Sequence, residues 1–204
     1  MDEYDNLIYQ IKEGYEKHIP TRPYIVALDG LSGAGKTTFV KQLKGILDNI
    51  VIIHIDDHIV ERSKRYETGQ EQWFEYYQLQ WDTKYLIEHL FQKIQQNVSF
   101  LKLPFYYKEK DTHINKIINL STNSIVIIEG IFLLRDEWKN FYDYIIFLDC
   151  PKKIRYERVL QRDTYIGDLE ERLEKYKKRY WVAEEYYLKK LKPYELAHYI
   201  QKSI

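Results

Sequence analysis

A phosphate-binding loop pattern constrains the fold of this chain more than any other feature of the sequence. Residues 30–37 read GLSGAGKT, an ungapped match to G-x-x-x-x-G-K-[ST]. The apolar run at 24–28 before the loop is typical of a buried strand, and residues 38–47 after it have the apolar spacing of a helix. This loop requires a strand before it and a helix after it, and an accidental glycine-rich turn does not. The sequence therefore predicts a nucleotide-binding protein.

The chemistry of the loop follows from its residue types. Glycine allows backbone angles and close approaches that a Cβ blocks, so successive N–H groups can point at phosphate oxygens, aided by the positive end of the following helix. Lys36 can reach the β- and γ-phosphates, and the Thr37 hydroxyl can bind Mg²⁺. The candidate nucleotide-binding residues are Gly30, Ser32, Gly33, Ala34, Gly35, Lys36, Thr37 and Thr38.

Size and charge narrow the class of protein. A length of 204 residues suits one α/β domain, and 31 basic residues balance 31 acidic ones. We therefore expect neither a nucleic-acid partner nor a membrane partner. The single Cys150 excludes an internal disulfide, and no apolar run resembles a signal peptide or a membrane span, so we expect a cytoplasmic protein. The sequence leaves homo-oligomer formation open.

Strand-like and helix-like stretches alternate along the chain. The strand-like runs are 24–28, 51–55, 125–128, 144–148 and 197–200. This alternation predicts an α/β fold, a P-loop NTPase-type parallel sheet with helices on both faces, in one domain over 1–204. Ligands of such sheets bind beyond the carboxyl ends of the strands.

Two segments depart from the simple alternation. An insertion at about 58–122 is helical in pattern over 70–97 and then extended over 98–103 and 114–120, and we expect it to shape the acceptor site. A helix from Pro151 to Arg162, followed by Gly167, suits a lid at about 155–170. Asp168 with Glu171 predicts a capping box that starts a long helix through Lys190.

Acidic residues follow two of the predicted strands. Asp56 and Asp57 come directly after IVIIHI, and Glu129 ends SIVIIEG. We predict that Asp56 accepts the proton of an acceptor hydroxyl, that Asp57 and His58 contact the substrate, and that Glu129 helps to hold Mg²⁺. The alternative for each carboxylate is a helix cap.

Three arginines share one face of the predicted lid helix. Arg155, Arg158 and Arg162 have i, i+3 and i+7 spacing, which suits a surface that closes on phosphates. We expect Arg162 to act in catalysis and Arg158 to bind the nucleotide. A solvated face that pairs with nearby acids is the alternative.

At this point the sequence resembles the uridine kinase-like group of P-loop kinases, which includes uridine/cytidine kinases, phosphoribulokinase and pantothenate kinase. The similarity spans most of residues 24–200 and is carried by GLSGAGKTT, IHIDDHI, IVIIEGIFLL and RYERVLQRD. The resemblance implies that Asp56 is the general base and that Arg162 is a lid residue near the phosphates. It also implies that Trp81 and Asp82, in QWD, border the acceptor pocket.

The resemblance is weaker at the acceptor site. The segment PFYY keeps Tyr106, but Tyr107 stands where the family has an acid. Ile166 and Asp168, rather than arginines, flank Gly167 in the lid.

We therefore expect an ATP- and Mg²⁺-dependent kinase that phosphorylates a hydroxyl of a small molecule, first of all a nucleoside such as uridine. Two alternatives stay open. One is a kinase for another acceptor, pantothenate-like or a sugar, which Tyr107 favours. The other is a nucleotide-dependent regulatory ATPase or binding switch.

Overall fold

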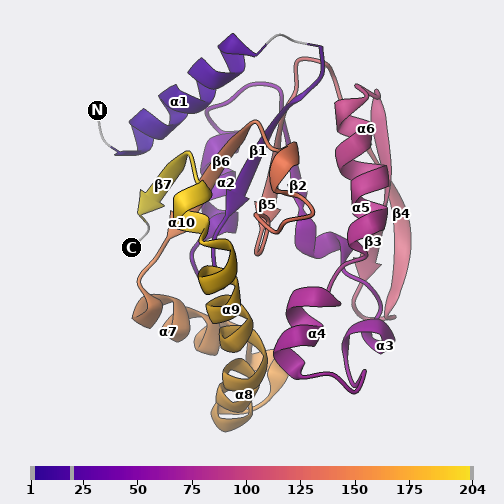
Figure 1. The fold of residues 1–204 in the computed structure, drawn as a ribbon, viewed down its shortest axis with the longest axis vertical. Helices are drawn as coiled ribbons and strands as arrows, with labels where there is room; N and C mark the ends of the chain where they lie inside the picture. Colours follow the sequence, from indigo (N-terminus) through magenta and orange to yellow (C-terminus); the bar gives the residue numbers. More distant parts are fainter. Residues whose placement is uncertain (1–2, 19–20, 203–204) are drawn as a thin grey trace.

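A five-stranded parallel sheet forms the centre of the computed structural model, which describes residues 3–18 and 21–202 (Figure 1). The strand order is β2-β5-β1-β6-β7, and every neighbouring pair is parallel. The strands are β1 (Tyr24–Asp29), β2 (Ile50–His54), β5 (Ile125–Gly130), β6 (Tyr144–Asp149) and β7 (Tyr199–Lys202). The carboxyl ends of β1, β2 and β5 therefore meet at one edge, and the predicted fold class is confirmed.

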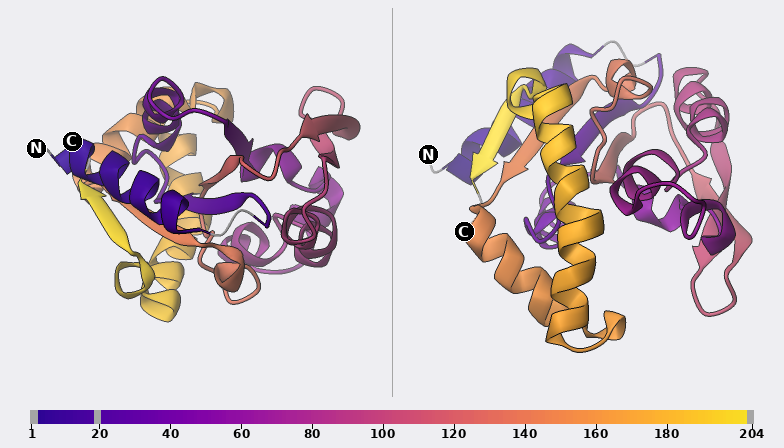
Figure 2. Two further views of the ribbon diagram at one scale, coloured as in Figure 1. Left: turned by 90° about the horizontal axis from the view of Figure 1, so that it is seen from above. Right: turned by 60° about the horizontal axis from the view of Figure 1, so that its bottom comes forward.

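Helices cover both faces because alternate residues of a strand point to opposite sides of the sheet. On one face, Val26 and Leu28 pack in a core with α1 (Glu3–Lys17) and α2 (Lys36–Lys44). On the other, Ile25 and Ala27 join a core that includes side chains from the insertion, from residues 131–142 and from α9 (Trp181–Leu191). Figure 2 shows the backbone of these segments. Both faces of β1 are thus buried, as its wholly apolar run from Tyr24 to Leu28 requires.

The predicted insertion contains short helices and a hairpin. Its elements are α3 (Arg62–Arg65), α4 (Gln72–Gln78), α5 (Thr83–Leu86), a π segment (Ile87–Phe91), α6 (Gln92–Gln95), β3 (Phe100–Tyr107) and β4 (Thr112–Asn119). The helical stretch predicted over 70–97 is interrupted at 79–82, because the Asp82 carboxylate accepts the Tyr85 N–H and starts a new helix. β3 and β4 form a separate antiparallel sheet.

The last third of the chain is mostly helical. Its elements are a 3₁₀ turn (Lys139–Phe141), α7 (Lys152–Arg162), a 3₁₀ turn (Thr164–Ile166), α8 (Leu169–Lys175), a π segment (Tyr176–Tyr180), α9 (Trp181–Leu191) and α10 (Pro193–Leu196). The predicted capping box of Asp168 and Glu171 is present. The last strand lies two residues later than predicted, because the Ala197 N–H still bonds to the Pro193 carbonyl of α10.

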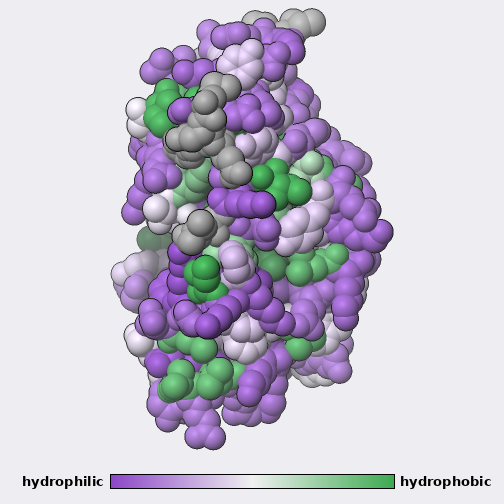
Figure 3. Space-filling view, turned by 90° about the vertical axis from the view of Figure 1, so that its left-hand side faces the viewer, coloured by the Kyte–Doolittle hydropathy of each residue, from purple (hydrophilic) through white to green (hydrophobic). Residues whose placement is uncertain are grey.

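The face of the molecule seen in Figure 3 is mostly hydrophilic. On the face that carries α1, β7 and α7, hydrophilic side chains predominate and hydrophobic ones are scattered (Figure 3). Within residues 3–18 and 21–202, no helix combines the length and the apolar character needed to cross a membrane.

Candidate active site

The phosphate-binding loop lies between β1 and α2, as predicted, and its backbone requires glycine. Gly33 and Gly35 have φ angles of +78° and +94°, which L side chains rarely adopt. A Cβ on Gly33 would also lie 2.6 Å from the Arg155 carbonyl oxygen. The Lys36 ammonium group donates to the carbonyls of Gly30 (2.7 Å) and Leu31 (3.3 Å). The lysine is thus held over the loop, where an incoming phosphate would meet it.

A cleft of about 1220 Å³ extends from this loop along the sheet edge. It brings together most of the site residues predicted from the sequence: Ser32, Gly33, Gly35, Lys36, Thr37, Thr38, Asp56, Asp57, Tyr106, Glu129, Arg158 and Arg162. Gly30 and Ala34 are buried residues of the loop and do not line the cleft. They shape the backbone of the loop rather than its open surface.

The three acidic residues meet at the edge of the sheet. Asp56 and Asp57 lie in a 3₁₀ turn (Ile55–His58) that follows β2. Glu129 lies opposite His54 in the pairing of β2 with β5. The Asp56 side chain is open to the cleft, but protein surrounds its other sides. This burial, together with the charges of Glu129 and Asp57, raises the pKa of Asp56 to about 6. A carboxylate with this pKa is ionised at neutral pH and is a competent proton acceptor.

His54 is part of this site, although the sequence interpretation did not include it. Its Nδ1 lies 2.5 Å from Glu129 Oε2, and this hydrogen bond raises the pKa of His54. The sequence pattern could have identified His54, because it is the polar residue at the end of an apolar strand that lies beside the strand of Glu129. The pair fixes the orientation of the Glu129 carboxylate.

The arginines of α7 have different partners. Arg155 is buried; it donates to the carbonyls of Cys150 (3.1 Å) and Ser32 (3.2 Å) and forms an ion pair with Glu184 (2.9 Å). Arg155 therefore supports the phosphate-binding loop from below and is not a lid residue.

The other two arginines of the stripe face the cleft. Arg158 Nη1 donates to the Gly33 carbonyl at 3.3 Å. Arg162 pairs with Asp163 through Nε and Oδ1 at 2.6 Å, and Tyr176 donates its hydroxyl to the same carboxylate. The Arg162 side chain is 64% exposed, so it can approach a bound phosphate.

Two further residues of α9 position the loop and were not predicted. Glu184 accepts the Ser32 N–H at 2.9 Å. Tyr187 donates its hydroxyl to Asp29, whose other oxygen accepts the Gly30 N–H at 2.8 Å. These contacts join residues more than 150 positions apart, and no local sequence pattern reports them.

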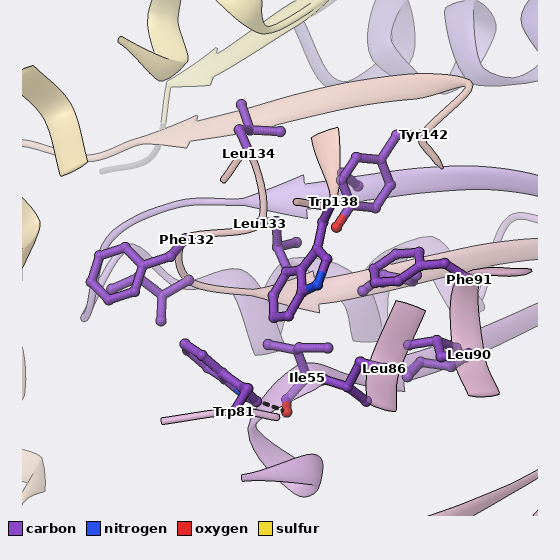
Figure 4. Close-up of a cluster of buried hydrophobic side chains, with 14 of the residues drawn as sticks. Ile55, Trp81, Leu86, Leu90, Phe91, Phe132, Leu133, Leu134, Trp138 and Tyr142 are labelled. Carbon is purple, nitrogen blue, oxygen red and sulfur yellow. Dashed lines mark hydrogen bonds between the residues drawn. The ribbon is translucent and has the colours of Figure 1, made fainter. Parts of the chain in front are cut away.

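Three residues predicted at the acceptor site lie outside the lining of the cleft. His58 is buried, donates from Nδ1 to the Pro104 carbonyl (2.9 Å) and packs against Phe105. Trp81 lies in the core, where its indole N–H donates to the Ile55 carbonyl at 2.9 Å (Figure 4). Asp82 caps α5. The sequence interpretation of these three is corrected: Trp81 and His58 hold the turn of Asp56 from behind, and Asp82 starts a helix.

The donors suit a magnesium ion that is bound together with a nucleotide. Among the residues that the structure describes, no group of three or more His, Cys, Asp and Glu side chains could hold a metal ion by itself. Mg²⁺ usually takes one or two protein oxygens, phosphate oxygens and water. Thr37 and Glu129, which line the same cleft, match that arrangement.

Comparison with known proteins identifies a family and several relatives of this chain. The sequence model of the phosphoribulokinase / uridine kinase family matches residues 25–186. A uridine kinase from Halalkalibacterium halodurans is 31% identical over 150 residues, which cover 70% of this chain and 68% of that one. A uridine kinase from Anoxybacillus flavithermus is 28% identical over 145 residues, with 70% and 68% covered. The solved structure of a possible uridine kinase from Bacillus stearothermophilus has a TM-score of 0.79 and 37% identity, covering 98% of this chain and all of that one.

Proposed function

Because this chain belongs to the phosphoribulokinase and uridine kinase family of ATP-dependent small-molecule kinases, we propose that it transfers the γ-phosphoryl group of ATP to a hydroxyl of a small molecule, for which a nucleoside such as uridine is the first candidate. The observation that carries the proposal is the position of Asp56. Its carboxylate and the Lys36 ammonium group line one cleft, and their charges interact. Phosphoryl transfer to a hydroxyl requires both a proton acceptor for the hydroxyl and a cation that binds the phosphates, and this cleft contains both.

In the proposed reaction, the acceptor hydroxyl donates a hydrogen bond to Asp56 and attacks the γ-phosphorus in line with the leaving ADP oxygen. The hydroxyl proton passes to Asp56, the new O–P bond forms, and the bond to ADP breaks. Lys36 and the loop amides hold the β- and γ-phosphates. Thr37 and Glu129 would hold Mg²⁺, which neutralises phosphate charge when it is bound.

The arginines complete the proposed donor site. Arg158 contacts the loop carbonyl of Gly33 and lines the cleft, so it is positioned to bind the nucleotide. Arg162 stabilises charge on the transferring group when the segment 155–170 closes as a lid. The insertion at about 58–122 supplies the acceptor side, including Asp57 and Tyr106 next to it in the cleft.

A second acceptor class has its own support. Tyr107 replaces the acid of the family pattern, and it does not line the cleft. Tyr106 instead donates to Asp111 at 2.7 Å. A pantothenate-like or sugar acceptor is therefore the second candidate.

A coupled ADP-release assay with ATP and Mg²⁺ tests the proposal. Nucleosides, sugars and pantothenate-like alcohols are supplied one at a time, and the phosphorylated product is identified by mass spectrometry. We expect at least one acceptor to raise ADP release well above the rate with water. ADP release that no acceptor stimulates, together with a nucleotide-dependent protein complex, would instead favour a regulatory ATPase.

A further inference from the structure

The charges that line the cleft are unevenly distributed. The insertion contributes three cationic side chains to the lining, Arg62, Arg65 and Lys108, against one acid, Glu67. The four other acids of the lining, Asp56, Asp57, Glu129 and Asp163, follow the strand ends or end the lid helix. We call the lining residues of the insertion the acceptor recess: Ile59, Arg62, Ser63, Arg65, Tyr66, Glu67, Tyr76, Gln80, Tyr106 and Lys108.

Arg65 is the most informative residue of the recess. Only 6% of the residue is exposed, yet it lines the cleft. Nε donates to the Val60 carbonyl at 2.8 Å, and the guanidinium lies over the rings of Tyr66 (4.9 Å) and Tyr106 (5.2 Å). Within the described part of the chain, no carboxylate lies within ion-pairing distance of this guanidinium. The Arg65 charge helps to lower the pKa of Asp111, but the Asp111 Oδ1 atom already accepts from the Tyr106 hydroxyl and from the Arg62 N–H.

A buried cation without a counterion is costly, and ring faces offset only part of that cost. The fold nevertheless fixes Arg65 in place. Its backbone carbonyl accepts from Arg179 Nη2 at 2.9 Å, and Arg179 forms a buried ion pair with Glu75 at 2.8 Å. The guanidinium is thus held at the wall of the recess, where it also interacts with the Tyr106 hydroxyl, and it has more N–H donors than this hydroxyl and the Val60 carbonyl use.

The other cations around the recess also lack carboxylate partners among the residues described here. Lys108 Nζ lies 3.6 Å from the ring centre of Tyr165, and Arg62 Nη2 donates to the Lys108 carbonyl at 3.2 Å. Lys175, from α8, borders the same space and lies 5.2 Å from the ring of Tyr66. The Gln80 side-chain oxygen is buried without a hydrogen-bond partner among these residues, and Gln80 lines the cleft as well.

We propose that the acceptor of this kinase carries an anionic group, a carboxylate or a phosphate, which Arg65 binds in the acceptor recess while Asp56 faces the reacting hydroxyl. A planar guanidinium presents paired N–H donors that match the two oxygens of such a group. Arg62, Lys108 and Lys175 add a favourable field, and Gln80 offers hydrogen bonds to a hydroxylated skeleton. The inference rests on the proposed kinase function. Among the candidate acceptors it selects an anionic alcohol, a class that includes the pantothenate-like second candidate, over the neutral nucleoside.

Matched pairs of acceptors test the proposal in the ADP-release assay. Suitable pairs are glycerate with glycerol, pantothenate with pantothenol, and ribulose 5-phosphate with ribulose, and uridine is the neutral nucleoside. We expect an anionic member to be used with a kcat/KM at least tenfold above that of its neutral partner and above that of uridine. The carboxylate and phosphate pairs show which of the two anions is preferred.

Variants assign that preference to Arg65. Arg65→Met should lower kcat/KM for the anionic acceptor by about 10-fold to 100-fold, mainly through KM, and leave the KM for ATP unchanged. Lys64→Met removes a neighbouring exposed cation that does not line the cleft and should change neither constant. Because Arg65 is buried, Arg62→Met is the second variant. It removes an exposed cation of the same recess and should raise KM for the anionic acceptor severalfold.

Two results would overturn the proposal, and they are distinguishable. If uridine or a neutral partner has the highest kcat/KM, or if Arg65→Met and Arg62→Met change kcat/KM for anionic and neutral acceptors by the same factor, Arg65 does not bind an anionic acceptor and the kinase function stands. If no acceptor of either kind stimulates ADP release while ATP still binds, the kinase function itself fails, and this inference fails with it.

Discussion

Glu184, in the first turn of α9, accepts a hydrogen bond from the Ser32 N–H of the phosphate-binding loop at 2.9 Å. Its other carboxylate oxygen pairs with Arg155 at 2.9 Å, and Arg155 in turn donates to the Ser32 carbonyl. A single buried carboxylate therefore connects the last long helix, the arginine helix α7 and the loop that is to hold the nucleotide. The shape of the loop depends on this contact as well as on its glycines.

The first prediction concerns that contact. Glu184→Ala leaves the buried Arg155 guanidinium unpaired, which typically costs about 3–5 kcal/mol of stability. The variant should unfold at lower denaturant concentration and bind ATP more weakly, because the Ser32 N–H also loses its partner. Denaturant unfolding and nucleotide titration measure the two effects.

Glu185→Ala is the matched control for Glu184→Ala. Glu185 follows directly in the sequence but is 53% exposed and pairs at the surface with Lys152. Such a pair contributes about 1 kcal/mol or less. Equal losses in the two variants would mean that Glu184 does not support the loop.

The second prediction concerns the proposed base. Asp56→Asn removes the proton acceptor with little change in volume, and kcat should fall by about 100-fold to 10,000-fold. Binding of ATP should be retained, because the loop is unchanged. Asp82→Asn makes the same chemical change at a helix N-cap, where asparagine serves equally well. Steady-state kinetics of both variants test this prediction, and full activity in Asp56→Asn would show that Asp56 is not the general base.

The pH dependence of the reaction gives a third prediction. With a pKa of about 6, Asp56 is mostly ionised above pH 7 and becomes protonated as the pH falls. We therefore expect kcat/KM to fall about tenfold per pH unit below pH 6 and to level off above it, since this constant reports the free enzyme. A profile that stays flat from pH 7 to pH 5 would contradict the role of Asp56.

The same pKa fixes the sign of the effect of Asp56 on stability. The folded-state pKa is raised from 3.8 to about 6, so the folded protein binds the proton more tightly than the unfolded chain. Ionised Asp56 consequently opposes folding, and its unfavourable contribution develops as the pH rises from about 4 to about 6 and persists above that. Asp56→Asn should therefore raise the melting temperature at pH 7.5 although it lowers kcat. A lower melting temperature would contradict this electrostatic account.

The sequence identified the parts of the site that a strand end or a motif locates. Lys36 belongs to the loop motif that follows β1, Asp56 and Glu129 each follow an apolar run, and parallel strands bring such ends to one edge. It misplaced His58, because consecutive residues of a tight turn point in different directions: Asp56 faces the cleft, whereas His58 faces the hairpin at Pro104.

Residues that depend on distant packing could not be found in this way. Glu184 reads as one of several charged residues of a long helix, and its contact with Ser32 spans 152 positions. Arg65 likewise lies in a polar run of the insertion, where no periodicity shows that its side chain is buried. The fold class was therefore predictable, and the support of the loop and the recess for the acceptor were not.

The last prediction concerns the glycine at the centre of the loop. Gly33→Ala places a Cβ at a φ of +78° and 2.6 Å from the Arg155 carbonyl oxygen, which is backbone and cannot simply move aside. The left-handed conformation alone costs about 1–2 kcal/mol, and the clash adds to it. Gly69→Ala is the matched control, because Gly69 has a φ of +83° but no atom within 4 Å of the added Cβ. We expect Gly69→Ala to lose only the conformational term and to keep ATP binding, whereas Gly33→Ala loses more stability and most of its ATP affinity. Nucleotide titration and thermal unfolding of the two variants test this, and ATP affinity equal to that of the unchanged protein in Gly33→Ala would show that the loop tolerates a different backbone.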